Sequence, residues 1–191
     1  TTVIAADKTG TMTQNKMAVT KYYLDRKIID VDQSSKNLKL MHDIMVNCNN
    51  ATLPDIGDPT DIGLLKIATL GEKYERIGEI PFSSKTKTMI TYHKYNDQIY
   101  TFSKFAPEKL VELCSFININ GRINPFTDSL KAEVLKANED LAKNALRVLG
   151  YAYSEGQKTN EFIFVGLSGM IDPPKPEVKS AIEKCKQYRE K

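Results

Sequence analysis

The sequence lacks the features that define several classes of protein. It contains no tryptophan and only three cysteines, Cys48, Cys114 and Cys185, which are odd in number and far apart. A disulfide framework or a metal site of paired cysteines is therefore disfavoured, and buried free thiols in a reducing compartment are the better interpretation. No apolar stretch approaches the roughly 20 residues of a membrane-spanning helix, so this stretch of chain is not expected to cross a bilayer.

A charge excess of one sign is also missing. The 27 basic and 24 acidic residues leave a formal net charge of +3, and no basic run alternates with aromatic residues. Nucleic acid is therefore not an expected partner. With 41% hydrophobic residues in 191 positions, the composition is that of an ordinary globular protein with one sizeable core. We expect the isolated chain to be soluble and monomeric.

The two ends of the chain are typical of a fragment excised from a larger protein. The sequence begins without methionine, in what we predict to be a strand, and stops at Lys191 inside a predicted helix. Residues 2–6 form a short apolar run that leads into Asp7 and a polar loop containing glycine. This is the pattern of a buried parallel strand that presents a residue at its carboxyl end.

Helical spacing and capping residues predict the helices between these ends. Apolar residues at helical intervals predict a helix over residues 35–49. The helix that follows should start with Asp58 as its N-cap and Pro59 at its first position, and should extend to about residue 70. Further helices are predicted from Pro107 to Cys114, over residues 128–146, and from Pro176 onward.

The remaining apolar segments alternate like strands and are separated by turn residues. Hairpin turns are predicted at Asp25-Arg26, Asn96-Asp97 and Asn120-Gly121. Strands are predicted over residues 17–24, 27–31, 76–82, 87–95, 98–104, 148–153 and 162–170. These are mainly antiparallel strands with helices between them, bracketed by a strand and loop at each end. The bracketing indicates an inserted domain that the chain enters after Thr13 and leaves near Ile171-Asp172.

Asp7 is a candidate nucleophile on chemical grounds. A carboxylate at the end of a strand can attack a phosphoryl group and form an acyl phosphate. The attack needs a cation that reduces the repulsion between the two anions, and small neighbours that let the phosphate approach. Lys8, Thr9 and Gly10 provide a positive charge, a hydroxyl and a flexible backbone. From composition alone, however, an ordinary polar turn is the favoured interpretation.

The full segment DKTGTMTQNKM, at residues 7–17, resembles the phosphorylation signature of P-type ATPases, and its second half resembles the type II, calcium-pump-like cation pumps. The resemblance implies that Asp7 takes the terminal phosphate of ATP, with Lys8 as its catalytic neighbour. It also implies that Thr9 holds Mg²⁺ through its carbonyl and the phosphate through its hydroxyl. The Mg²⁺ site, formed by Asp7 and Thr9, is expected to be incomplete in this chain.

Two further segments resemble parts of the same family's nucleotide pocket. In GDPTDIGLL, at residues 57–65, Asp61 stands where the family has a glutamate that contacts the adenine. An acidic residue in the first turn also suits a helix that binds nothing. KFAPE, at residues 104–108, resembles the family's KGAPE and places Lys104 at the mouth of the adenine pocket. Phe105 replaces the usual glycine, so its ring either narrows the pocket or points away from it.

The segment PFSSKTKTM, at residues 81–89, resembles another part of the pocket. The resemblance implies that Phe82 stacks on adenine and that Lys87 lies near the base or the phosphates. Ser84 stands where some relatives carry an arginine that touches phosphate, and Met89 is assigned to the same site. Without the resemblance, a lone phenylalanine is more often a core residue.

The last two segments complete the resemblance in the family's order. RVLG, at residues 147–150, resembles RVLA, whose arginine reaches the phosphates, a role that suits the planar donors of Arg147. Taken alone, Arg147 would be interpreted as a partner of a helix dipole. GLSGMIDPPKP, at residues 166–176, resembles the return to the phosphorylation domain, where the proline pair stiffens one arm of a hinge.

The resemblance implies an α+β fold, mainly an antiparallel sheet flanked by helices, inserted into an incomplete haloacid-dehalogenase-like α/β domain. Residues 1–15 and 171–191 are expected to belong to the phosphorylation domain, and residues 16–170 to form the nucleotide-binding domain. ATP and Mg²⁺ are the implied ligands. The phosphorylation, actuator and membrane domains of an ion pump are the implied partners, with this domain on the cytoplasmic face of the membrane.

The chain is expected to bind ATP without sustained hydrolysis, because the family's Thr-Gly-Asp and Gly-Asp-Gly loops do not occur in its sequence. Two alternatives remain. A free-standing haloacid-dehalogenase-like phosphatase would also use a strand-end aspartate, but it needs a later acidic loop that this sequence lacks. A regulatory module that no longer binds nucleotide is suggested by Phe105 and Ser84. The transported ion cannot be inferred, since ion ligands would lie in membrane helices.

Overall fold

The computed structural model of the chain describes residues 5–187. Its centre is a nine-stranded sheet in the order β2-β1-β9-β8-β5-β4-β3, which the hairpin of β6 and β7 joins where β6 runs parallel to β9. The other pairings among the described strands are antiparallel. The strands are β1 (Ala18–Leu24), β2 (Lys27–Asp30), β3 (Glu75–Ser83), β4 (Thr88–Tyr95), β5 (Gln98–Phe105), β6 (Cys114–Ile119), β7 (Arg122–Pro125), β8 (Arg147–Glu155) and β9 (Phe162–Ile171).

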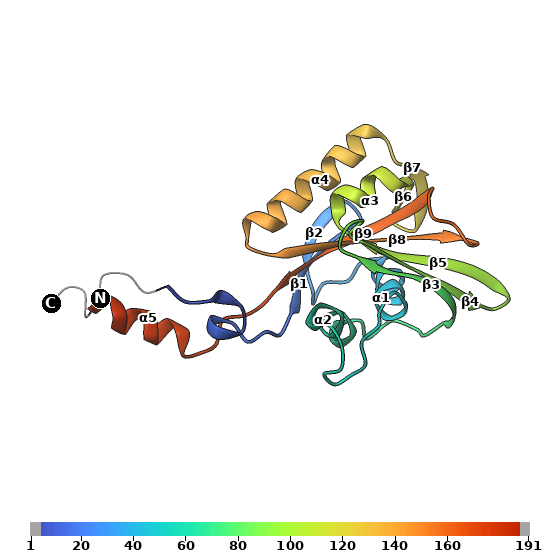
Figure 1. The fold of residues 1–191 in the computed structure, drawn as a ribbon. Helices are drawn as coiled ribbons and strands as arrows, with labels where there is room; N and C mark the ends of the chain where they lie inside the picture. Colours follow the sequence, from blue (N-terminus) through green and yellow to red (C-terminus); the bar gives the residue numbers. More distant parts are fainter. Residues whose placement is uncertain (1–4, 188–191) are drawn as a thin grey trace.

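Helices cover both faces of this sheet (Figure 1). Helices α1 (Leu38–Asn47) and α2 (Pro59–Ile67) lie on one face, over a core that includes Tyr22, Phe102 and Tyr151. Helices α3 (Pro107–Leu113) and α4 (Asp128–Lys143) lie on the other face, over a core built around Phe162 and Phe164. The predicted α+β class, a mainly antiparallel sheet flanked by helices, is confirmed.

The three predicted hairpin turns are confirmed, and their backbone explains them. The turn residues Asp25-Arg26, Asn96-Asp97 and Asn120-Gly121 all have positive φ angles, between 48° and 79°. Two consecutive residues in this region form the tight turn whose twist matches that of antiparallel strands. Asparagine, aspartate and glycine tolerate this region best, so the turns could be found from local sequence.

Helix α2 begins as the sequence predicts. The carboxylate of Asp58 accepts a hydrogen bond from the backbone N–H of Thr60 at 2.8 Å, and Pro59 occupies the first position of the helix. Gly63 lets α2 pack closely on the start of β1, since a Cβ atom there would lie 2.4 Å from the carbonyl oxygen of Met17. This contact fixes the first turn of α2, with Asp61, against the sheet.

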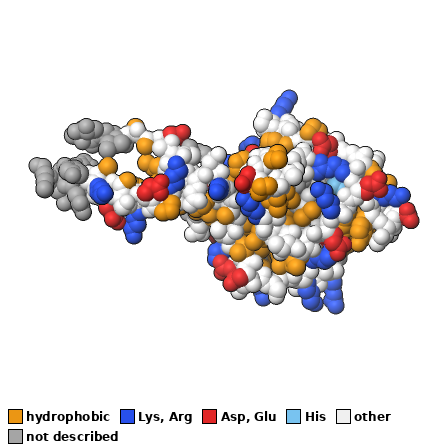
Figure 2. Space-filling view, turned by 90° about the horizontal axis from the view of Figure 1, so that it is seen from below, with side chains coloured by type: hydrophobic (Ala, Val, Ile, Leu, Met, Phe, Trp, Pro, Cys, Tyr) orange, Lys and Arg blue, Asp and Glu red, His pale blue; other side chains and the backbone are white. Residues whose placement is uncertain are grey.

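The chain enters and leaves the sheet domain through a paired neck. The Thr13 hydroxyl donates to Asp172 Oδ2 at 2.6 Å, and the N–H of Lys16 donates to Asp172 Oδ1 at 3.2 Å. Backbone hydrogen bonds join Gln14 to Pro173 and Lys175 to Met12. Beyond the neck, the N-terminal segment and α5 (Val178–Gln187) form a narrow extension beside the broader sheet domain (Figures 1 and 2).

Several predictions about local structure differ from the structure: α1 spans Leu38–Asn47 rather than residues 35–49, and α2 ends at Ile67 rather than near residue 70. Of the strand predicted over residues 2–6, residues 2–4 lie outside the described residues, and Ala5 and Ala6 are exposed and outside any strand because no described strand pairs with them. Helix α4 ends at Lys143 rather than at residue 146, because Ala145 takes a positive φ of 57°. All three thiols are free, but Cys185 is exposed on α5 and only Cys48 and Cys114 are buried.

His93 gives the stability of this fold a dependence on pH. The residue lies on β4 with 1% of its surface exposed. Burial lowers the pKa of His93 to about 4, and the positive charge of Arg76 acts in the same direction. The unfolded chain takes up this proton near pH 6.5, whereas the folded chain does so only near pH 4. The stabilisation is therefore present above pH 6.5 and is lost as the pH falls towards 4.

We expect the free energy of unfolding to fall by about 3 kcal/mol across this window because of His93. Urea unfolding followed by circular dichroism between neutral and acidic pH measures the fall. A His93→Phe variant, which keeps an aromatic ring in the core, should lose less stability over the same range. Burial also lowers the pKa of His42. Because His42 is present in both proteins, its contribution to the pH dependence of stability cancels in the comparison. Parallel pH profiles for the two proteins would contradict this account.

Candidate functional site

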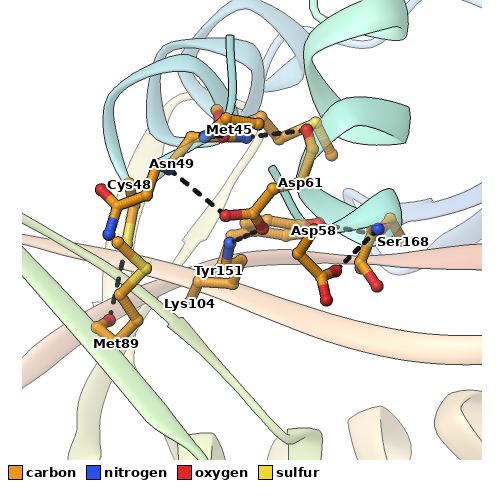
Figure 3. Close-up of polar contacts among 12 residues, drawn as sticks. Met45, Cys48, Asn49, Asp58, Asp61, Met89, Lys104, Tyr151 and Ser168 are labelled. Atoms are coloured by element: carbon orange, nitrogen blue, oxygen red, sulfur yellow. Dashed lines mark hydrogen bonds and ion pairs between the residues drawn. The ribbon is translucent and has the colours of Figure 1, made fainter. Parts of the chain in front are cut away.

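The centre of the candidate site is a buried ion pair between Asp61 and Lys104 (Figure 3). Asp61 lies in the first turn of α2, and Lys104 lies near the end of β5. Their side chains are 14% and 8% exposed, and the Lys104 ammonium donates directly to Asp61 Oδ1. The fold thus brings together two residues that the sequence analysis assigned to one site from separate segments.

Met89 and Tyr151 form the floor beneath this pair. Both are register partners of Lys104, Met89 on β4 and Tyr151 on β8, and both are almost completely buried. The Tyr151 hydroxyl shares a 2.8 Å hydrogen bond with the Ser168 hydroxyl, and burial raises the pKa of Tyr151. The Cys48 thiol donates to the carbonyl of Met89 at 3.5 Å. The floor is therefore rigid, and the Lys104 ammonium is its charged group.

The segment at residues 81–89 forms one side of the site at the same end of the sheet. Phe82 is 62% exposed at the end of β3, so the interpretation of Phe82 as a core residue is wrong. Ser84 and Lys87 are exposed in the turn between β3 and β4. The carbonyl of Lys87 accepts a hydrogen bond from the N–H of Ala106 at 3.2 Å, which ties this turn to the segment that follows Lys104.

Arg147 lies at the start of β8, and its side chain contacts the first turn of α2. Its guanidinium donates to the Thr60 hydroxyl at 3.0 Å, next in sequence to Asp61. This contact is at the N-terminal end of α2, the positive end of the helix dipole, where a cation is unfavourable for the helix alone. The interpretation of Arg147 as a dipole partner concerned the end of the preceding helix, α4, and the contact with Thr60 on α2 does not test it.

Phe105 requires a correction, because its side chain does not line this site. Neighbouring residues in a strand point to opposite faces, so Phe105 faces α3 and α4 when Lys104 faces α1 and α2. The Phe105 ring is 1% exposed and packs in the second core, with its centroid 5.8 Å from that of Phe162. Of the two possibilities stated for Phe105, the ring points away and does not narrow the site.

The loop at residues 7–13, which contains the candidate nucleophile Asp7, lies apart from this site. Asp7 is exposed at the start of the extension, and the turn of π-helix that follows covers Lys8–Met12. The Lys175 ammonium donates to the carbonyl of Gly10 at 2.9 Å and ties this loop to the returning chain. Figure 1 shows the loop separated from α2 and β5 by the neck. Within the described residues, no group of three or more His, Cys, Asp or Glu side chains is placed to hold a metal ion.

Asp61 is held in place by residues that were not among the predicted site residues. Asn49 Nδ2 donates to the Asp61 carbonyl at 3.0 Å, and the N–H of Asn50 donates to Asp61 Oδ2 at 3.3 Å. Arg76 donates to the same loop. The asparagines Asn47, Asn49 and Asn50, at the end of α1 and just after it, were the available signal, because asparagine side chains commonly bind nearby backbone.

Comparison with known proteins identifies the family. The family described as "P-type ATPase, cytoplasmic domain N" matches residues 31–177, which is more than half of the chain. The chain therefore belongs to this family of P-type ATPase domains. No helix among the described residues is both long enough and apolar enough to span a membrane.

Among its relatives are whole cation pumps. The chain is 38% identical to Calcium-transporting ATPase 1 of Bacillus cereus, over 97% of this chain and 23% of that protein. It is 35% identical to Calcium-transporting ATPase 1 of Lactococcus lactis, over 98% of this chain and 24% of that protein. It is 30% identical to Potassium-transporting ATPase alpha chain 2 of Rattus norvegicus, over 97% of this chain and 23% of that protein. The chain thus spans less than a quarter of each of these curated relatives.

Proposed function

We propose that this chain is the ATP-binding part of a cation-pumping P-type ATPase, and that the base of ATP binds beside the Asp61–Lys104 pair. One observation carries the proposal. Asp61, Lys104 and the exposed ring of Phe82, which come from three separate segments, are placed at one end of the sheet over a buried floor. An ion pair so little exposed is costly to build, because both charges lose much of their hydration.

Each of these side chains has chemistry that suits ATP. The face of Phe82 is available for stacking on a purine ring. The Asp61 carboxylate is an acceptor for the amino group of adenine, and its contact with the Lys104 ammonium fixes its orientation. Met89 contributes the apolar floor. Lys87 and Arg147 are the cations proposed to face the phosphates, with Ser84 as a polar neighbour.

In the intact pump, the proposed role of this domain is to deliver ATP so that Asp7 is phosphorylated. Residues 1–15 and 171–191 are assigned to the phosphorylation domain, and residues 16–170 to the ATP-binding domain. The neck formed by Thr13, Lys16 and Asp172 would be the hinge between them. Because ATP must be released after each transfer, we propose only modest affinity.

Mg²⁺ is proposed to join the bound phosphate at Asp7. The exposed Asp7 carboxylate and the carbonyl of Thr9 are oxygen ligands of the kind that Mg²⁺ prefers, and the remaining ligands would come from phosphate and water. The ion would reduce the repulsion between the carboxylate of Asp7, as nucleophile, and the phosphate. The 191-residue chain alone is proposed to bind ATP without sustained turnover, with Lys8 beside the nucleophile. The alternative of a module that does not bind nucleotide then rests on Ser84, since the Phe105 ring points away.

Phe82 provides the first test of this function. We expect a Phe82→Ala variant to bind ATP about tenfold or more weakly, because stacking on an aromatic side chain contributes about 1–3 kcal/mol per base. Its free energy of unfolding should change by less than about 0.5 kcal/mol, because the ring is mostly exposed. Isothermal titration with ATP, with and without Mg²⁺, measures the affinity.

The matched control for this test is Phe116→Ala. Phe116 is also an exposed phenylalanine, at 42%, but it lies on β6, away from Lys104. It should leave ATP affinity unchanged. Equal ATP affinity in the unaltered chain and the Phe82→Ala variant would contradict the proposed site, and a lack of binding by the unaltered chain would contradict the proposed function.

A further inference from the structure

Arg76 lies near the start of β3 and joins this strand to the loop between α1 and α2. Its Nη2 donates to the carbonyls of Asn47 at 2.5 Å and Asn49 at 2.7 Å. Its Nη1 donates to Asn50 Oδ1 at 2.5 Å and to Glu79 Oε2 at 2.8 Å. The side chain is 31% exposed. One guanidinium therefore fixes three of the four residues in the 47–50 segment.

That segment in turn holds Asp61. The N–H of Asn50 binds Asp61 Oδ2, while Lys104 binds Oδ1, so the carboxylate is held from two sides. Asn49 Nδ2 also binds the carbonyl of Asp61. Asn50 is therefore the one residue that links Arg76 to the Asp61 carboxylate. Arg76 binds the side chain of Asn50, and the backbone N–H of Asn50 binds the carboxylate.

The strand that carries Arg76 also carries Phe82 at its other end. Arg76 thus connects the two proposed walls of the base site, the Phe82 ring on β3 and the Asp61 carboxylate on α2. A guanidinium suits this role because its planar fork of donors can serve several acceptors in fixed directions, which a lysine ammonium cannot reproduce. Asn47 makes a separate connection, accepting from the N–H of Tyr74 and donating to the carbonyl of Glu72, so the loop stays attached to this region without Arg76.

We infer that Arg76 is a positioning residue that sets the base selectivity of the site, by holding the Asp61 carboxylate where the amino group of adenine would meet it. The inference rests on the proposed ATP-binding function. Inosine triphosphate is the probe, because it carries a carbonyl oxygen in place of that amino group, together with a hydrogen on the neighbouring N1. A carboxylate held in place favours ATP and repels the carbonyl, whereas a carboxylate free to turn away discriminates less.

The experiment compares the unaltered chain with Arg76→Gln and Arg76→Lys by titration with ATP and with inosine triphosphate. We expect Arg76→Gln to weaken ATP binding about tenfold and inosine triphosphate binding by less than about twofold, so that the ratio of affinities falls. Arg76→Lys should restore the ratio only in part. The control is Arg26→Gln, which removes another arginine–glutamate pair, Arg26 with Glu133, at the far turn between β1 and β2. It should leave the ratio unchanged.

A second measurement needs no nucleotide. Hydrogen exchange of the Asn50 N–H in the ligand-free protein should speed up about tenfold or more in Arg76→Gln, because the loop loses its anchor. Equal losses of ATP and inosine triphosphate affinity would show a merely structural role and overturn the inference, as would full rescue of the ratio by lysine. An unchanged rate of hydrogen exchange at the Asn50 N–H in Arg76→Gln would overturn the inference about Arg76, whatever the ATP affinity. Failure of the unaltered chain to bind ATP overturns the proposed function and, with it, the selectivity role.

Discussion

Replacing Lys104 with methionine is expected to lower the free energy of unfolding by about 3 kcal/mol. The substitution keeps an unbranched side chain that is one atom shorter, but leaves the Asp61 carboxylate, 14% exposed, without its cation. Breaking a buried pair by removing one partner typically costs about 3–5 kcal/mol, since the remaining charge stays desolvated. The exposed fraction of Asp61 places the expected loss at the lower end. Urea unfolding at neutral pH measures it.

The double variant Asp61→Asn with Lys104→Met is the control for this prediction. It removes both charges, and replacing a whole buried pair by neutral residues is often close to neutral, so most of the lost stability should return, to within about 1 kcal/mol of the unaltered chain. ATP binding should be lost in both variants. A folded double variant that cannot bind ATP would separate the role of the pair in binding from its role in stability. A loss below about 1 kcal/mol in Lys104→Met would contradict the burial of the pair.

Replacing Phe105 with glycine, as in the KGAPE segment that residues 104–108 resemble, is expected to cost about 4 kcal/mol of stability. The ring fills a core position under α3 and α4, and removing a buried phenylalanine side chain typically costs about 3–5 kcal/mol, to which glycine adds backbone entropy. ATP affinity should stay within about twofold, because the ring lies on the face of the sheet opposite to Lys104.

Phe105→Leu keeps this prediction testable if the glycine variant does not fold. It should lose less stability than the glycine variant, because most of the apolar volume remains, and it should likewise bind ATP normally. Thermal unfolding and isothermal titration of the same samples measure both properties. A marked gain or loss of ATP affinity in a folded Phe105 variant would show that the ring faces the nucleotide after all.

Local signals were enough for the elements that position the site. The left-handed turn residues Asn96-Asp97 and Asn120-Gly121, and the cap formed by Asp58 and Pro59, follow from the conformational preferences of those residues. The meeting of Asp61 with Lys104 does not, because it depends on how α2 packs across β5. The resemblance to a known family assigned both residues to one pocket, but it did not predict the ion pair between them.

Other features depended on tertiary structure that no local pattern records. Phe105 and Lys104 are neighbours on β5, so their side chains point to opposite faces of the sheet. Because helices cover both faces, burial alone could not predict which of the two side chains faces the site. The role of Arg76 could not be predicted from sequence, because two of its partners are backbone carbonyls, which every residue has. The parallel pairing of β6 with β9 joins segments distant in sequence and has no turn to mark it.

The central claim, that ATP binds on the face of the sheet covered by α1 and α2, is tested most directly by heteronuclear NMR of the unaltered chain during titration with ATP. The account predicts saturable shifts of the backbone amides at Asp61, at Lys104 and in the turn around Lys87, with little change around Phe162 and along α4. Shifts concentrated on α3 and α4, or none at ATP concentrations in the millimolar range, would contradict it.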